Sequence, residues 1–180
     1  CDVDVGVVTP LASGLKQNLL LGEEVEKFPD RLVGFFWANP RNMSSAEDLR
    51  KGVDLDRFRG VKLRPESDSY KINNARLLGP LLDVVEELGL VVYVHSHFES
   101  RFSFPRALAH LAEAFPGVTF LLGHMGGESM EAVEVASRHP NIVLETSGVK
   151  YPKSILEAVS MLGPERIVFG SDFPYLRMPT

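Results

Sequence analysis

The stretch Arg166-Ile-Val-Phe-Gly-Ser-Asp-Phe-Pro-Tyr175 decides how the rest of the chain is interpreted. It opens with an apolar run of β-branched and aromatic residues, which predicts a short buried strand. Gly170 ends the run, and Pro174 prevents a further ladder because proline has no N–H to donate. Asp172 therefore follows the carboxyl end of a strand, where a buried carboxylate needs a cation, a metal ion or water. Taken alone, this stretch is better explained by a solvated aspartate that begins a loop or caps a helix.

Short apolar runs of the same kind precede this stretch and are typical of strands in a parallel sheet that is covered by helices. They are Asp4–Thr9, Leu32–Ala38, Gly60–Leu63, Leu90–His95, Val118–Gly123 and Ile142–Glu145. Helical spacing of apolar residues occurs between most of these runs. The predicted helices are Asn18–Phe28, Ser44–Lys51, Leu77–Leu88, Pro105–Phe115, Glu128–Arg138 and Lys153–Leu162. Ser44 or Ser45 is the expected cap of the second helix.

This alternation of strands and helices predicts an α/β fold with a parallel sheet. A (β/α)8 TIM-type barrel uses about 30 residues per unit, so seven strands in 180 residues fit such a barrel that lacks one unit and part of another. The sequence shows no linker, and residues 1–180 are expected to form a single barrel domain. A doubly wound open sheet is the alternative, although Thr9–Gly14 matches a nucleotide-binding glycine-rich turn poorly.

Composition excludes several classes of function. The chain is 44% hydrophobic with a net charge of −5, which fits a globular domain and argues against a nucleic-acid partner. No apolar run approaches the ~20 residues that span a bilayer, so no membrane association is expected. The single cysteine, Cys1, excludes an internal disulfide and fits a reducing compartment, so we expect a cytoplasmic protein. A small-molecule substrate is the expected partner, and a homodimer remains open.

Polar residues recur at the carboxyl ends of the predicted strands, where barrel enzymes place their chemistry. His95, His124 and Asp172 follow three separate strands and are candidate ligands of one divalent metal ion. Imidazole and carboxylate donors suit zinc best, with manganese or iron as alternatives. His124 and Asp172 are also candidates for proton transfer. A single histidine at a strand end is more often bonded locally, but three such positions make that explanation weaker.

Further residues at the strand ends are candidates for binding a substrate. They are Lys62, Arg64 and His97. Two cations would suit a carboxylated substrate, although structural ion pairs explain Lys62 and Arg64 equally well, and His97 either lines the pocket or faces solvent. Glu145 is expected to partner a buried cation or to support a group that contacts the substrate.

The motifs Gly60-Val-Lys-Leu63, Val94-His95, Leu122-Gly-His-Met-Gly126, Asn141–Thr146 and Arg166–Pro174 together resemble the amidohydrolase superfamily. More narrowly, the chain is similar to the amidohydrolase-related branch that also contains metal-dependent decarboxylases. The resemblance implies a (β/α)8 barrel with a divalent metal at the strand ends. It implies that His95 is a metal ligand, that His124 is a ligand or a catalytic acid/base, and that Asp172 contacts the metal and its water. It also implies an upstream strand with a His-x-His motif and a downstream closing helix, which are expected outside residues 1–180.

The resemblance predicts a metal-dependent hydrolase acting on a C–N, C–O or lactone bond of a small, carboxylated substrate. Non-oxidative decarboxylation at the same site is the first alternative, and a degenerate barrel without catalysis is the second. A metal-dependent nuclease of the TatD type is disfavoured, because the chain is acidic and lacks basic clusters.

Overall fold

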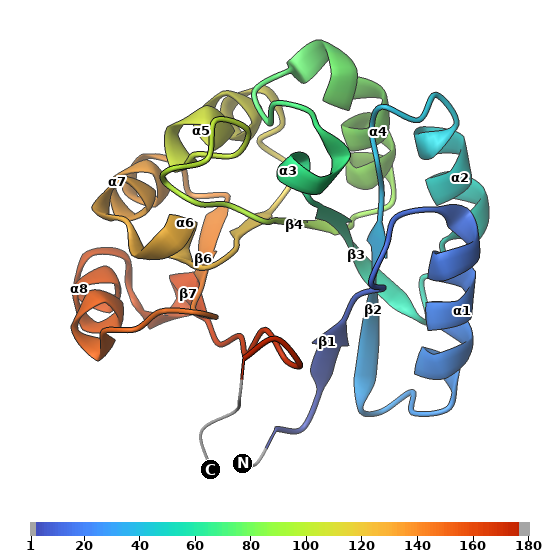
Figure 1. The fold of residues 1–180 in the computed structure, drawn as a ribbon, viewed down its shortest axis with the longest axis horizontal. Helices are drawn as coiled ribbons and strands as arrows, with labels where there is room; N and C mark the ends of the chain where they lie inside the picture. The colour runs from blue at the N-terminus through green and yellow to red at the C-terminus, as the bar shows by residue number, and fades with distance from the viewer. Residues whose placement is uncertain (1–2, 177–180) are drawn as a thin grey trace.

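The computed structural model describes residues 3–176 and shows one parallel sheet whose seven strands follow the order of the chain (Figure 1). The strands are β1 (Gly6–Val8), β2 (Leu32–Trp37), β3 (Phe58–Leu63), β4 (Val91–Val94), β5 (Phe120–Leu122), β6 (Ile142–Glu145) and β7 (Ile167–Val168). Every strand pairs in parallel with the next, and at least one helix lies in each connection. This is the topology of a (β/α)8 barrel, and it confirms the expected fold class.

The larger helices lie along the outer side of the curled sheet, as Figure 1 shows. They are α1 (Leu15–Glu26), α2 (Ser45–Gly52), α4 (Ala75–Glu87), α5 (Pro105–Ala114), α7 (Met130–Arg138) and α8 (Pro152–Leu162). Shorter turns of helix are α3 (Pro65–Asp68), α6 (Met125–Glu128) and η1 (Pro164–Arg166). No helix among residues 3–176 has the length and apolar character needed to cross a membrane.

Alternation along the strands separates the hydrophobic core from the inner face of the sheet. Residues that point toward the helices are fully buried, for example Val92, Leu122 and Leu144. The intervening positions point to the concave side, where Lys62 pairs in register with Tyr93 and Tyr93 with Leu121. Since successive side chains of a strand point to opposite faces, the core and the site use alternate residues of the same strands.

Strand β7 is shorter and more exposed than the sequence predicted. We expected a buried strand through Gly170, but β7 ends at Val168, both of its residues are only partly buried, and Phe169 is 66% exposed. The reason is that β7 is an edge strand, which pairs with β6 and, within residues 3–176, with no strand on its other side. Strand β1 forms the opposite edge, and its Val7 is 57% exposed.

The predicted helix Glu128–Arg138 is wrong at its start. The chain forms α6 first, and α7 then begins at Met130, where the Ser129 side chain accepts a hydrogen bond from the Glu131 N–H. Gly126 and Gly127 have φ values of 64° and 79°, in the left-handed region that glycine adopts without a Cβ penalty. These two glycines therefore separate the strand end from α7 with a tight turn.

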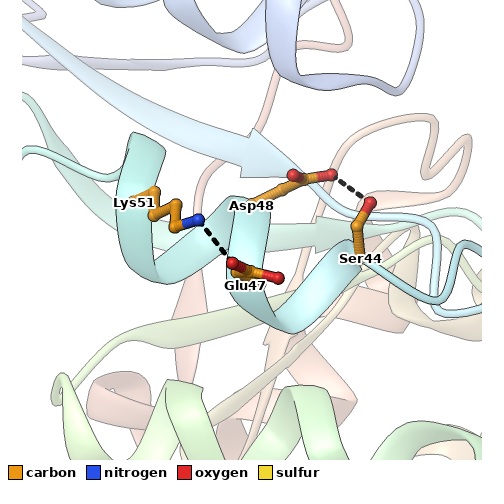
Figure 2. Close-up of polar contacts among 4 residues, drawn as sticks. All are labelled: Ser44, Glu47, Asp48 and Lys51. Carbon is orange, nitrogen blue, oxygen red and sulfur yellow. Dashed lines mark hydrogen bonds and ion pairs between the residues drawn. The ribbon is translucent and has the colours of Figure 1, made fainter.

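Helix α2 begins as predicted, with Ser44 as its N-cap residue, but the cap works differently (Figure 2). The Ser44 hydroxyl donates to the Asp48 carboxylate at 2.7 Å instead of accepting from a backbone N–H of the first turn. Lys51 and Glu47 form an ion pair one turn apart on the exposed side of the helix. Such exposed pairs contribute little to stability, so the helix depends mainly on the burial of Leu49.

A substitution at the buried residue Leu122 tests the packing of the helix-facing core. The change Leu122→Ala is expected to lower the free energy of unfolding by about 2–5 kcal/mol, because it removes buried methyl groups and leaves a cavity. Urea unfolding measures this loss, and Leu156→Ala on the exposed side of α8 is the matched control (Leu156 is 68% exposed). Equal stability of both variants would contradict this description of the core.

Candidate active site

The candidate residues lie at the carboxyl ends of the strands. Arg64 directly follows β3, His95 directly follows β4, and His124 follows β5 after one glycine. Asp172 lies in the turn after β7. Lys62 belongs to β3 itself and points to the concave side of the sheet. Parallel strands present their carboxyl ends at one edge, which is why residues so distant in sequence share one end of the barrel.

The two imidazoles of His95 and His124 face each other. His95 Nδ1 lies 3.0 Å from His124 Nε2, and the rings meet edge to face with centroids 4.7 Å apart. Burial, followed by the proximity of His124, lowers the pKa of His95 to about 4. His95 is therefore neutral near pH 7, which is the form that coordinates a metal ion.

This pair fits part of a metal site. Two nitrogens bound to one ion at ~2.1 Å, at an angle between octahedral and tetrahedral, would lie ~3.0–3.4 Å apart. The observed separation of 3.0 Å between His95 Nδ1 and His124 Nε2 falls in that range. However, residues 3–176 contain no group of three His, Cys, Asp or Glu side chains placed to hold one ion. The described residues thus offer two imidazole donors, and Asp172 does not join them in a three-residue cluster.

Asp172 nevertheless acts on the inner face through its charge. It has a left-handed backbone with φ 52°, and its carbonyl accepts from the N–H groups of Tyr175 and Leu176 at 2.9 and 3.1 Å. Its carboxylate favours the charged form of Lys62 and contributes to the raised pKa of Tyr93. The turn after β7 therefore holds a partly buried carboxylate near the cation of β3.

Two cations surround Trp37 on the inner face. Lys62 Nζ lies 5.6 Å from the Trp37 ring centre and 5.3 Å from that of Tyr93, and it donates to the Thr9 hydroxyl at 3.2 Å. Arg64 approaches Trp37 at 5.7 Å. Burial, and then the charge of Arg64, lowers the pKa of Lys62, while Asp172 and Glu145 oppose that shift. Among the described residues, neither Lys62 nor Arg64 forms a direct ion pair, so both cations remain available to an anion.

Glu145 forms a buried network behind His124. It is 6% exposed, and its carboxylate accepts from the Tyr93 hydroxyl at 3.2 Å and from the His124 N–H at 3.2 Å. It also accepts from the N–H of Ser147 at 2.6 Å and from the hydroxyl of Ser147 at 2.8 Å. Sequence reasoning anticipated a supporting role for Glu145, with a cation as one candidate partner, but missed Ser147. The only signal for Ser147 was its place two residues beyond a strand end.

His97 differs from the other two histidines, because its side chain is exposed. Its ring stacks on Phe98 at 4.8 Å, and it lines a pocket together with His95, Glu66 and Arg101. A second pocket, lined by His97, His124 and Tyr151 among others, adjoins it. His97 therefore lines both hollows, one with His95 and the other with His124.

Glu66 is a further residue that sequence reasoning missed. One of its carboxylate oxygens accepts from the hydroxyls of Ser100 and Ser103, and the other is buried without a partner among the described residues. Glu66 lines the same pocket as His95 and favours the protonated form of that histidine. A buried acceptor without a donor is costly, and the same carboxylate places a negative charge beside this pocket.

The fold is a parallel α/β sheet of the (β/α)8 type, and two imidazoles face each other at its strand ends. The Amidohydrolase family model matches residues 3–179, and the chain belongs to this family. This confirms the resemblance drawn from the sequence motifs. The comparison with curated proteins gives no match.

Solved structures share the fold. The 5-carboxyvanillate decarboxylase of Sphingomonas paucimobilis is 18% identical with a TM-score of 0.77, covering 97% of this chain and 70% of its own. A 5-carboxyvanillate decarboxylase of Novosphingobium aromaticivorans, crystallised with manganese and 3-methoxy-4-hydroxy-5-nitrobenzoic acid, is 16% identical with a TM-score of 0.75 (97% and 68% covered). An uncharacterised TIM-barrel protein of Bordetella bronchiseptica is 19% identical with a TM-score of 0.78 (96% and 66% covered).

The lowered pKa of His95 predicts a pH-dependent stability of the metal-free protein. Because the folded value is about 4 and the ordinary value is 6.5, the unfolded chain binds more protons between these limits. The contribution of neutral His95, at most about 3 kcal/mol, is present above pH ~6.5 and is lost as the pH falls toward 4. Urea unfolding after chelator treatment measures the free energy of unfolding at pH 7 and at pH 5. Its decrease from pH 7 to pH 5 should be smaller for His95→Gln than for the unchanged protein. The same change at exposed His110 is the control, and an equal loss in His95→Gln would contradict the assignment.

Proposed function

We propose that the protein is a divalent-metal-dependent, non-oxidative decarboxylase of a small hydroxylated aromatic or unsaturated carboxylic acid. The observation that carries the proposal is the imidazole pair of His95 and His124 at the same barrel mouth as the cations Lys62 and Arg64. Family membership and the similarity to decarboxylase structures support it. The hydrolase that we expected first is less well supported, because two of the three structures described are decarboxylases of carboxylated aromatic substrates.

The cations of the inner face would hold the substrate. Lys62 and Arg64 flank one aromatic ring, Trp37, and this arrangement suits a planar anion that accepts hydrogen bonds from both. A hydroxylated aromatic acid offers such an anion on one rigid, planar ring.

A metal ion, when bound beside His95, would act as a Lewis acid that polarises the oxygens of the substrate. Its ligand in this chain would be His95, because His124 is kept for proton transfer and Asp172 does not join the imidazoles in a three-residue cluster among the described residues. The metal would be manganese or zinc. The bond between the ring carbon and the carboxyl carbon breaks, CO2 leaves, and the electron pair stays on the ring carbon. A proton from Nε2 of protonated His124 then reaches that carbon, so the carboxylate is replaced by hydrogen without any change in oxidation of the protein.

The assay for this function is release of CO2 from hydroxylated benzoates by the purified protein supplied with Mn2+ or Zn2+. Metal-dependent release, abolished by a chelator, is the expected outcome. A hydrolase would instead cleave amides, esters or lactones of the same acids without forming CO2. That second result would reject the decarboxylase and restore the first interpretation.

Asp172→Asn is expected to lower kcat by roughly 10²–10⁴-fold, the usual scale for a group that moves or positions a proton. Asparagine keeps the size of the side chain but loses its charge and basicity. Turnover is measured together with bound metal and the far-ultraviolet circular dichroism spectrum. Unchanged turnover at full metal content would show that turnover does not need the charge or basicity of Asp172.

Lys62→Met tests the binding of the substrate carboxylate. Loss of a charge-assisted hydrogen bond should raise KM by roughly 10- to 100-fold with a smaller effect on kcat. Lys153→Met, on the exposed start of α8, is the matched control because it removes the same charge outside the barrel mouth. A KM equal to that of the control would show that Lys62 does not bind substrate.

A further inference from the structure

We infer that Glu145 and Ser147 together hold the proton of neutral His124 on Nδ1 and leave Nε2 as its basic nitrogen. The inference deepens the proposed function, because that nitrogen is the one that faces His95 and the reacting groups. The two residues act through His124 and are positioning residues, since neither is proposed to touch the substrate.

The Glu145 carboxylate is surrounded by hydrogen-bond donors. Four donors point at its carboxylate: the Tyr93 hydroxyl, the N–H groups of His124 and Ser147, and the Ser147 hydroxyl, at distances of 2.6–3.2 Å. A carboxylate accepts all four bonds, whereas a carboxylic acid would need an acceptor for its own proton. This set of partners therefore fits an ionised Glu145 that only accepts hydrogen bonds.

The neighbours of the Ser147 hydroxyl fix its orientation. Its oxygen lies 2.8 Å from the Glu145 carboxylate and 2.9 Å from His124 Nδ1, and it has one hydrogen to give. If that hydrogen pointed to His124, two oxygen lone pairs would face each other at the carboxylate. The hydroxyl therefore donates to Glu145 and presents only a lone pair to His124.

The two neighbours of Nδ1 determine the tautomer of His124. Its Nδ1 has two neighbours within hydrogen-bond distance, the Ser147 hydroxyl at 2.9 Å and the Ser147 carbonyl at 3.1 Å. Both are acceptors, so Nδ1 carries the hydrogen and Nε2 carries the lone pair in the neutral ring. Nε2 points at His95 Nδ1, 3.0 Å away, where it can accept a proton or contribute to a cation site.

The surroundings show that this arrangement is built into the fold. Glu145 and Ser147 are 6% and 4% exposed, so water does not compete for their hydrogen bonds. A Cβ on Gly170 would lie 1.4 Å from a carboxylate oxygen of Glu145, which means that only glycine leaves room for this side chain. His124 itself has a left-handed backbone with φ 58°, and its N–H is held by Glu145.

The chemical consequence is a histidine with a fixed direction of proton transfer. Neutral His124 can accept a proton only at Nε2, and the imidazolium so formed keeps its Nδ1–H on Ser147. Ser147, which is itself bonded to Glu145, orients the ring, as carboxylates do for histidines in metal sites.

The test is the tautomer of His124, read by nitrogen-15 NMR of the histidine-labelled, metal-free protein at a pH where the ring is neutral. The His124→Gln variant assigns the signal. The expected spectrum shows hydrogen on Nδ1 and a bare Nε2. A spectrum with hydrogen on Nε2 would overturn the inference directly, without any variant.

Ser147→Ala then tests whether Ser147 sets the tautomer of His124 or only supports the fold. Loss of one of the two acceptors should raise the fraction of the Nε2–H tautomer roughly 2- to 10-fold, the ratio that one neutral hydrogen bond supports. Ser147→Thr, which keeps the hydroxyl, should restore the original tautomer, and Ser137→Ala on the exposed side of α7 should leave it unchanged. A folded Ser147→Ala protein with an unaltered tautomer would refute the role of Ser147.

The tautomer measurement and the activity assay test separate claims. Hydrogen on Nδ1 in a protein that releases no CO2 from any hydroxylated benzoate would support the roles of Glu145 and Ser147 and reject the proposed function. Hydrogen on Nε2 in an active decarboxylase would reject those roles and support the proposed function.

Discussion

The structure depends on the alternation of side chains along parallel strands. One set of residues, such as Val92, Leu122 and Leu144, is buried completely against the helices and supplies the core. The other set points to the concave side and is free to be polar, because core packing is already complete without it. This division allows one short strand to stabilise the fold and to serve the site at the same time.

Charged side chains on the inner face are partly or fully buried, which is electrostatically unfavourable. Lys62 and Glu145 lie in surroundings that disfavour isolated charges, and each depends on partners that come from other strands. Aromatic rings and the Thr9 hydroxyl surround the lysine, whereas four donors surround the carboxylate. Desolvated groups of this kind retain strong interactions with any charge that enters, and a binding or catalytic site needs such interactions.

Hydrolysis and decarboxylation make similar demands on this end of the barrel. Both need a carbonyl or carboxylate to be polarised and a proton to be delivered at a defined point. Cations for an anionic substrate and a pair of neutral imidazoles serve either reaction, so the site alone does not distinguish them. The proposed decarboxylation gives the two cations beside Trp37 a role, since they would bind the carboxylate of the substrate.

Local sequence determined the strands, most of the helices and the candidate residues at the strand ends. Apolar runs such as Ile142–Glu145 predict their strands because β-branched residues and short length leave few alternatives. Position after a strand was enough to select His95 and His124, since the carboxyl ends of parallel strands share one edge. The tertiary structure alone decided which side chains touch. The contact between Ser147, Glu145 and His124 joins the end of β6 to the turn after β5. The exposure of Phe169 follows from the edge position of β7. Periodicity reports which face a residue occupies, but hydrogen bonds and burial depend on the neighbouring strands, and only the folded sheet brings those together.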